Sequence, residues 1–137
     1  MRITIFAPGK VHLLEIAGVR DALFEANCKM GPSRSYRVLL VTEQGIAEES
    51  ASGVTYVPDA GIADAIQACD TLIVVGPYGL PTRPSDDVMR WLRKQALSSR
   101  RYGSTCTGAF VLAQAGLLSG RRATTHWQYA ERLATDF

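Results

Sequence analysis

The stretch Thr71-Leu72-Ile73-Val74-Val75 constrains the fold more than any other part of the sequence. Its side chains are apolar on both faces of an extended strand, which is typical of a central strand in a parallel sheet covered by helices on both sides. The apolar run Leu72–Val75 is far shorter than the roughly 20 residues that a membrane-spanning helix needs. We therefore predict a buried parallel strand here, in a soluble protein that does not enter a membrane.

Strand-like and helix-like segments alternate along the 137 residues. In addition to residues 71–75, the predicted strands are Arg2–Ala7, Tyr36–Thr42, Val54–Val57 (or a hairpin arm), Tyr102–Cys106 and Arg122–Thr125. The predicted helices are Leu14 to Gly31-Pro32-Ser33, Gly61–Cys69, Pro84–Ala96, Thr107–Leu118 (closed by Gly120) and Ala130–Phe137. This alternation indicates one α/β domain over residues 1–137, with a mostly parallel sheet. Because the last helix stops at Phe137 with no cap or closing strand, we expect that the C-terminal part of the domain is missing.

Composition and charge exclude several classes of protein. With 47% hydrophobic and 20% charged residues, the chain is neither disordered nor fibrous. The formal net charge of +2 is too small to indicate a nucleic-acid-binding protein, although residues 1–68 carry −2 and residues 69–137 carry +4. The basic second half suits either an acidic partner or a solvated surface. The three cysteines form no C-x-x-C pair and the two histidines stand apart, so we predict no metal, no cofactor and a cytoplasmic location with reduced thiols.

Gly103-Ser104-Thr105-Cys106-Thr107-Gly108 is the most informative stretch for chemistry. Small residues let a strand turn sharply into a helix, which leaves Cys106 exposed at the turn. Unpaired N–H groups at the start of the helix then favour a reactive thiolate. The alternative is a buried core cysteine, which is the commonest fate of a free thiol. We predict the sharp turn for Cys106 and structural roles for Cys28 and Cys69, which lie in predicted helices.

The sequence around Cys106 resembles the ThiJ/PfpI superfamily, whose domains have a class I glutamine amidotransferase-like fold. The resemblance lies in Ser104–Ala113, Ala115–Leu118, Gly120–Trp127 and, near the N-terminus, Pro8-Gly9 and Leu13–Gly18. Within the superfamily the chain is most similar to the sensor domains of AraC-type transcriptional regulators, and it is also similar to isonitrile hydratase. The resemblance implies a flavodoxin-like three-layer sandwich with a mostly parallel sheet.

The resemblance also implies that Glu15 lies beside Cys106 and is hydrogen-bonded to it. Both residues would follow the carboxyl ends of neighbouring strands, where open α/β sheets bind ligands. Taken alone, Glu15 is an acid in the first turn of a helix, which the helix dipole favours. The remaining residues expected to line a ligand pocket are Gly76, Tyr78, Thr107 and His126.

Two positions depart from the pattern of the enzymes in the superfamily. Proteases and amidotransferases have a histidine directly after the cysteine or in a triad with it, whereas Thr107 stands there in this chain. His126 follows 20 residues later and either faces the same cleft or packs beside Trp127. Relatives have two consecutive glycines after the strand at residues 71–75, and Pro77 in this region has no N–H to help form an oxyanion hole.

These departures favour a small-molecule-sensing, non-catalytic domain of an AraC-family regulator. Such a domain would be a homodimer and would reach DNA only through a DNA-binding domain that is absent from this chain. The alternative is a cysteine-dependent hydratase of the isonitrile hydratase type, with Cys106 as nucleophile and Glu15 as acid and base. A thiol-based stress protein or a glyoxalase-like protein is a third reading.

Overall fold

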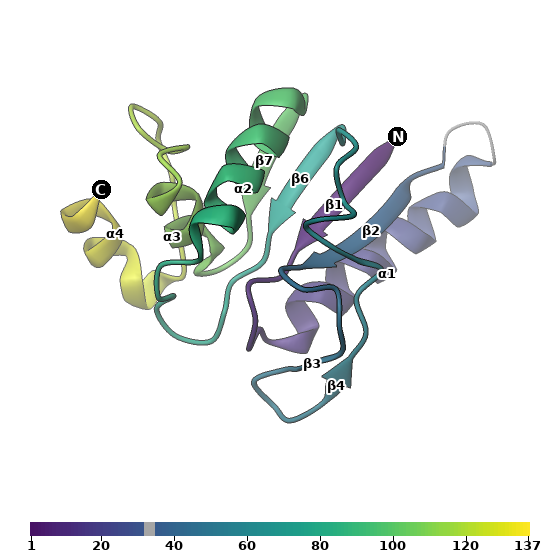
Figure 1. The fold of residues 1–137 in the computed structure, drawn as a ribbon, viewed down its shortest axis with the longest axis horizontal. Helices are drawn as coiled ribbons and strands as arrows, with labels where there is room; N and C mark the ends of the chain where they lie inside the picture. Colours follow the sequence, from purple (N-terminus) through teal and green to yellow (C-terminus); the bar gives the residue numbers. More distant parts are fainter. Residues whose placement is uncertain (32–34) are drawn as a thin grey trace.

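The computed structural model describes residues 1–31 and 35–137, so Pro32 and Ser33 at the expected end of the first helix lie outside the described residues. Its centre is a five-stranded sheet with the strand order β5 (Ala60–Gly61), β2 (Arg37–Thr42), β1 (Arg2–Phe6), β6 (Thr71–Val74) and β7 (Arg101–Ser104). All four neighbouring pairs are parallel. The predicted parallel sheet is confirmed, and β6 lies inside it, between β1 and β7 (Figure 1).

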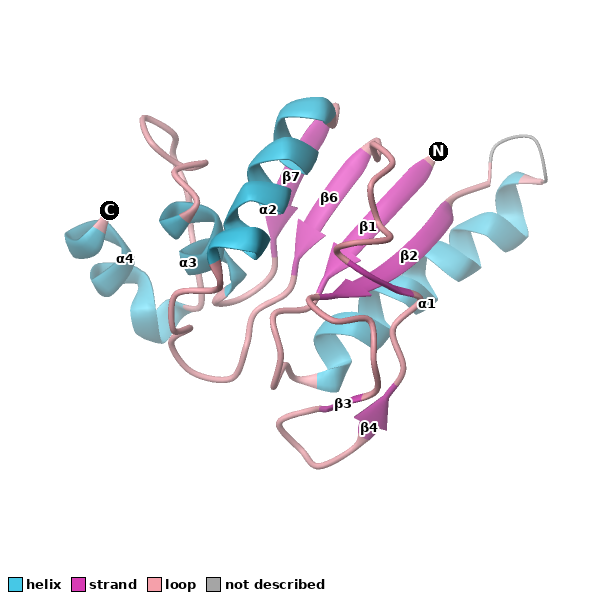
Figure 2. Cartoon of the chain, in the orientation of Figure 1, coloured by secondary structure: helices cyan, strands magenta, loops and turns pink. Residues whose placement is uncertain are grey.

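Helices cover both faces of the sheet. In Figure 1, α2 (Asp86–Ser98) lies in front of the strands and α1 (Leu13–Met30) lies behind them. The smaller elements are the hairpin of β3 (Glu48–Glu49) and β4 (Thr55–Tyr56), α3 (Gly108–Gln114), the 3₁₀ turn η2 (Trp127–Tyr129) and α4 (Ala130–Asp136). Figure 2 shows α3 and α4 beyond the β7 end of the sheet. No helix in the described part of the chain is long and apolar enough to cross a membrane.

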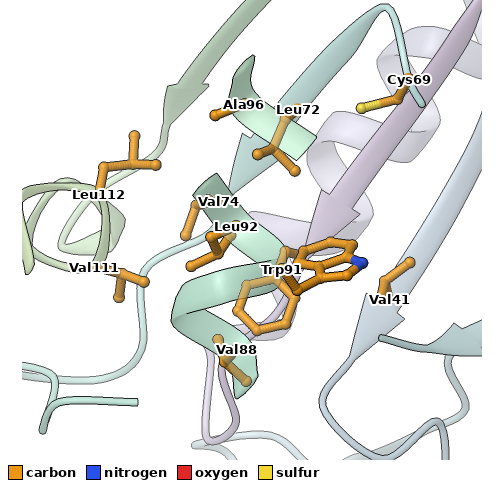
Figure 3. Packing of buried hydrophobic residues seen from close by; sticks show 11 residues of the cluster. Val41, Cys69, Leu72, Val74, Val88, Trp91, Leu92, Ala96, Val111 and Leu112 are labelled. Atoms are coloured by element: carbon orange, nitrogen blue, oxygen red, sulfur yellow. The ribbon is translucent and has the colours of Figure 1, made fainter. Parts of the chain in front are cut away.

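The core explains why the strand at residues 71–75 is apolar on both faces. Leu72 and Val74 pack in a cluster with the buried face of α2 (Figure 3). Ile73 and Val75 belong to a second cluster on the α1 side of the sheet. Because successive side chains of a strand point to opposite faces, one short sequence contributes to both layers of the core.

Helix α2 begins where the sequence predicts. Ser85 is its N-cap, and the Ser85 Oγ accepts a hydrogen bond of 3.2 Å from the backbone N–H of Val88. Asp86 and Asp87 follow in the first turn, where the helix dipole favours acidic side chains. The Ser85 hydroxyl also donates to the Glu43 carboxylate at 2.6 Å, which ties the start of α2 to the segment after β2.

The predicted helix at Gly61–Cys69 is wrong. The segment makes a single turn, in which the Ala65 N–H donates to the carbonyl of Gly61 at 2.9 Å. It does not continue: the Ile66 N–H donates to the carbonyl of Asp64 at 2.9 Å instead of to that of Ile62. Trp91 Nε1 and Gln95 Nε2 of α2 donate to the Ala65 carbonyl at 2.9 and 3.0 Å, which ties this turn to α2. Cys69 therefore lies outside any helix, buried in the core just before β6.

The two predictions after Cys106 need correction as well. Helix α3 ends at Gln114 instead of Leu118, because Gly116 takes a left-handed conformation (φ 73°). Its N–H donates to the carbonyl of Ala113, and the Leu117 N–H donates to that of Leu112, which closes the helix as a Schellman motif. Residues 122–125 form no strand, since no neighbouring strand pairs with them in the described chain.

Candidate functional site

Cys106 lies in a sharp turn between β7 and α3. Its backbone is in the left-handed region, with φ of 48°, which is uncommon for a residue other than glycine. Two backbone hydrogen bonds hold the turn: the Thr105 N–H donates to Val74 at 3.1 Å, and the Gly108 N–H donates to Thr105 at 2.9 Å. The predicted turn is present, with the half-buried Cys106 at its pivot. Such strain costs about 1–3 kcal/mol and clusters at functional sites.

Gly76, which follows β6, lies against this turn. A Cβ on Gly76 would lie 2.6 Å from the backbone nitrogen of Thr107 and 3.0 Å from the Cβ of Cys106. Only glycine therefore fits here. Thr107 is buried, and its hydroxyl donates to the carbonyl of Pro77 at 2.6 Å. These contacts bring Gly76, Thr107 and Cys106 together, and the role of these residues in a ligand site stays a prediction.

The loops after β1 and β6 are tied to each other beside the turn. Val11 and Pro77 form an antiparallel bridge, and the Tyr78 N–H donates to the carbonyl of Lys10 at 3.0 Å. The ring of Tyr78 meets the ring of His12 edge-on, with centroids 5.3 Å apart. Sequence reasoning placed Tyr78 at a pocket but did not find His12 as its partner, because the contact depends on the path of two loops.

Glu15 occupies the first turn of α1, directly after the loop that follows β1. It is half-buried, and its N–H donates to the carbonyl of His12 at 2.9 Å. None of the hydrogen bonds assigned among the described residues joins Glu15 to Cys106. The pairing of these two side chains therefore stays a prediction.

The described contacts of the His126 ring are with residues that follow it closely in the sequence. Its Nδ1 accepts a hydrogen bond of 3.2 Å from the Gln128 N–H. Its ring lies 5.6 Å from that of Trp127 and 5.8 Å from that of Tyr129. His126 thus packs beside Trp127, and its role at the ligand site stays a prediction. The neighbouring Thr125 hydroxyl donates to the Cys106 carbonyl at 3.0 Å, so this segment also touches the turn.

A cavity of about 510 Å³ opens at the carboxyl ends of β1 and β6. This is where the strand order reverses direction, at the point where open α/β sheets bind ligands. Tyr78 lines the cavity, together with side chains that sequence reasoning missed. Those that carry charge are Lys10, Glu43, Glu48 and Arg83. They come from loops that are far apart in the sequence, and no motif in the sequence indicates that they meet.

The three thiols differ in their surroundings. Cys69 is buried, and burial raises the pKa of its thiol, whereas Cys28 is exposed on α1. In the described part of the chain, no group of three or more histidine, cysteine, aspartate or glutamate side chains is arranged to hold a metal ion.

A parallel α/β sheet with a cysteine at a strained strand-to-helix turn defines a class of domains that present a nucleophile at the carboxyl edge of the sheet. The chain belongs to the DJ-1/PfpI family, which it matches over residues 1–136. Among solved structures it superposes on an AraC family transcriptional regulator from Pseudomonas putida with a TM-score of 0.78. That match has 22% sequence identity and covers 98% of this chain and 71% of the other.

Curated relatives fall into different classes. The chain is 41% identical to an uncharacterised protein in the cpoL 5′ region of Streptomyces lividans, over 97% of this chain and 92% of that protein. It is 36% identical to isonitrile hydratase of Pseudomonas putida, over 92% of this chain and 52% of the enzyme. It is 33% identical to the HTH-type transcriptional regulator GbdR of Pseudomonas aeruginosa, over 85% of this chain and 31% of the regulator. The chain thus spans about half of the enzyme and a third of the regulator.

Proposed function

We propose that the chain is the small-molecule-sensing, non-catalytic domain of an AraC-family transcriptional regulator. Regulators with a helix-turn-helix are among its relatives, and this domain corresponds to part of their length. The ligand binds at the carboxyl edge of the sheet, near Cys106 and Glu15 and the cavity bordered by Tyr78. The domain acts in the cytoplasm as a homodimer and reaches DNA through a DNA-binding domain outside this chain.

The observation that carries this proposal is that no hydrogen bond assigned among the described residues joins a side chain to the Cys106 thiol. General acid–base catalysis needs a side chain that can reach the reacting group and exchange a proton with it. The Thr107 hydroxyl is engaged with the Pro77 carbonyl, and the His126 Nδ1 is engaged with the Gln128 N–H. Pro77 has no N–H, so it cannot help to stabilise an oxyanion. These features favour binding over turnover.

The second candidate is a cysteine-dependent hydratase, which the 36% identity to isonitrile hydratase supports. In this mechanism the Cys106 thiolate adds to the terminal carbon of an isocyanide while Glu15 delivers a proton to that carbon. Water then attacks the resulting thioimidate, and loss of the thiol yields a formamide and restores Cys106. The strained turn at Cys106, with φ of 48°, suits this chemistry as well as ligand binding.

The two candidates predict different results for turnover. We expect no measurable hydrolysis or hydration when the domain is incubated with isocyanides, amides or dicarbonyl compounds. A metabolite that raises the melting temperature and is recovered unchanged supports the sensing function, because binding to the folded state alone stabilises it. The Cys106→Ser variant serves as the control for thiol-dependent activity. A kcat near the ordinary enzyme value of about 10 s⁻¹ that is lost in this variant would overturn the proposal in favour of the hydratase.

The placement of Glu15 beside Cys106 has a separate test. If the Glu15 carboxyl group donates a hydrogen bond to the thiolate, Glu15→Leu should slow iodoacetamide alkylation of Cys106 near neutral pH by about tenfold. Glu15→Gln keeps a donor of similar shape, so its rate should lie between those of Glu15→Leu and the parent. Mass mapping of the adducts follows Cys106, with Cys28 as an internal reference.

Superimposable pH–rate profiles for the three proteins would show that Glu15 is remote from Cys106. Preferential labelling of Cys28 over Cys106 in the parent would contradict the reactive thiol itself. Continued protection of the buried Cys69 from alkylation in all three proteins excludes a global loss of structure as the cause of any difference, because unfolding would expose that thiol.

A further inference from the structure

Lys10 and Cys106 share an uncommon backbone conformation. In the described part of the chain they are the two residues other than glycine with a positive φ, at 39° for Lys10 and 48° for Cys106. A residue with a Cβ is crowded by its own backbone in this left-handed region. Such strain persists only where the surrounding contacts over-determine it. The contacts that hold Lys10 in this conformation lead to Cys106.

A single peptide group, between Pro77 and Tyr78, joins the two strained positions. Its N–H donates to the carbonyl of Lys10 at 3.0 Å. Its C=O accepts a hydrogen bond of 2.6 Å from the hydroxyl of Thr107, the residue after Cys106. The N–H and C=O of a trans peptide point in opposite directions, so this planar group lies between Lys10 and Thr107. A rotation that breaks one of the two hydrogen bonds therefore misaligns the other.

The surroundings leave this peptide group little freedom. The ring of Pro77 fixes its φ. Val11, the neighbour of Lys10, forms an antiparallel bridge with Pro77 and is fully buried. The carbonyl of Val11 also accepts a hydrogen bond of 2.8 Å from the Ala51 N–H, in the loop of the β3–β4 hairpin. The backbone of Lys10 and the turn at Cys106 thus share one rigid support.

The side chain of Lys10 does not account for its strained backbone. It is exposed, and no hydrogen bond or ion pair of its ammonium group is assigned among the described residues. The fold uses the carbonyl of Lys10 instead, as the acceptor for Tyr78. Lys10 and Tyr78 line the cavity at the carboxyl edge of the sheet, whereas Cys106 does not. The shared peptide group therefore connects the cavity to the thiol.

We propose that Lys10 is a positioning residue for Cys106. Its backbone orients the Pro77–Tyr78 peptide, this peptide fixes the Thr107 hydroxyl, and Thr107 keeps the turn in which the Cys106 thiol is presented. A group that displaces Lys10 or Tyr78 from inside the cavity changes the reactivity of the thiol through this link. The link is present in the protein without a ligand, so it holds for a sensing domain and for a hydratase alike.

Substitutions at Lys10 separate the effect of its backbone from that of its charge. Lys10→Asn and Lys10→Val both remove the ammonium group, but asparagine tolerates the left-handed region and the β-branched valine does not. Near neutral pH, iodoacetamide should alkylate Cys106 about threefold more slowly in Lys10→Val than in Lys10→Asn, an effect typical of residues coupled through shared contacts. Mass mapping follows Cys106, and continued protection of the buried Cys69 shows that each variant is folded.

Variants of Thr107 test the other half of the link. Thr107→Val removes the hydroxyl that donates to Pro77 and should slow alkylation of Cys106 by about threefold as well. Thr107→Ser keeps the hydroxyl and should restore most of the rate. In Lys10→Val/Thr107→Val the loss should match that of the slower single variant, because both changes release the same peptide group. Two unrelated structural defects would instead multiply.

Two results would overturn the proposal. Equal alkylation rates in Lys10→Asn and Lys10→Val would show that the backbone of Lys10 does not act on Cys106. Losses that multiply in the double variant would show that Lys10 and Thr107 act independently. If Lys10→Val exposes Cys69 to the reagent, Lys10→Ala takes its place, because alanine disfavours the left-handed region less strongly than valine. The comparison with Lys10→Asn is then decided in the same way.

Discussion

Replacing Gly108 by alanine should destabilise the domain by about 3 kcal/mol, the upper end of the usual cost of overpacking. A Cβ at this position would overlap the backbone carbonyl oxygen of Val74, and would lie 3.0 Å from the carbonyl carbon of the same residue. Backbone atoms cannot turn away as a side chain can, so β6 and α3 would have to separate. Urea unfolding followed by circular dichroism measures the loss as a lower midpoint at an unchanged slope.

Gly103 supplies a matched control for this substitution. It lies in β7, close to Gly108 in the sequence, and a Cβ there would meet no atom within 4 Å. Gly103→Ala should therefore leave stability unchanged or raise it by up to about 1 kcal/mol, because alanine loses less conformational entropy than glycine on folding. Equal destabilisation by both variants would mean that any side chain near the turn is harmful. The contact between Gly108 and β6 would then not be the cause.

The sheet and the turn at Cys106 were predictable because their signals are local. An apolar run at residues 71–75 needs a buried strand, and the small residues around Cys106 favour a tight turn. Both features depend on a few consecutive residues whose preferences agree with the final structure. The start of α2 at Ser85 was predictable for the same reason, since a capping side chain and two acids mark it.

The features that sequence reasoning missed depend on residues that are distant in the sequence. A single turn replaces the helix expected at Gly61–Cys69, and its Ala65 carbonyl accepts from Trp91 and Gln95 of α2, contacts that no local pattern in the sequence indicates. The cavity at the carboxyl edge takes its charged lining from segments after β1, β2 and β6. The predicted strand at residues 122–125 has the right composition, but no strand among the described residues pairs with it. A strand gains its hydrogen bonds only from a partner, and composition alone does not supply one.

Phe6, the last residue of β1, connects the hydrophobic core to the cavity of the candidate site. Phe6 is 1% exposed and belongs to the core cluster on the α2 side of the sheet. Its ring lies 5.3 Å from that of Trp91. It also lines the cavity at the carboxyl edge. One side chain thus joins the core to the place where we propose that a ligand binds.

Phe6→Ala should cost about 3–5 kcal/mol of unfolding free energy, because it removes a buried ring and leaves a space that the rigid sheet cannot close. Phe24→Ala makes the same chemical change on the outer face of α1, where the side chain is 62% exposed, and should change stability by less than about 0.5 kcal/mol. Urea unfolding of the parent and both variants gives the comparison.

If Phe6→Ala does not fold, Phe6→Leu keeps most of the volume and should lose less than Phe6→Ala. The difference in unfolding free energy lost by the Phe6 and Phe24 variants then tests whether the hydrophobic core lies between β1 and α2. A large loss from Phe24→Ala would contradict this assignment, since it would place the main apolar contacts of the protein on the outer face of α1. In that case this face would have to be buried in solution against another molecule, because the fold itself leaves Phe24 exposed.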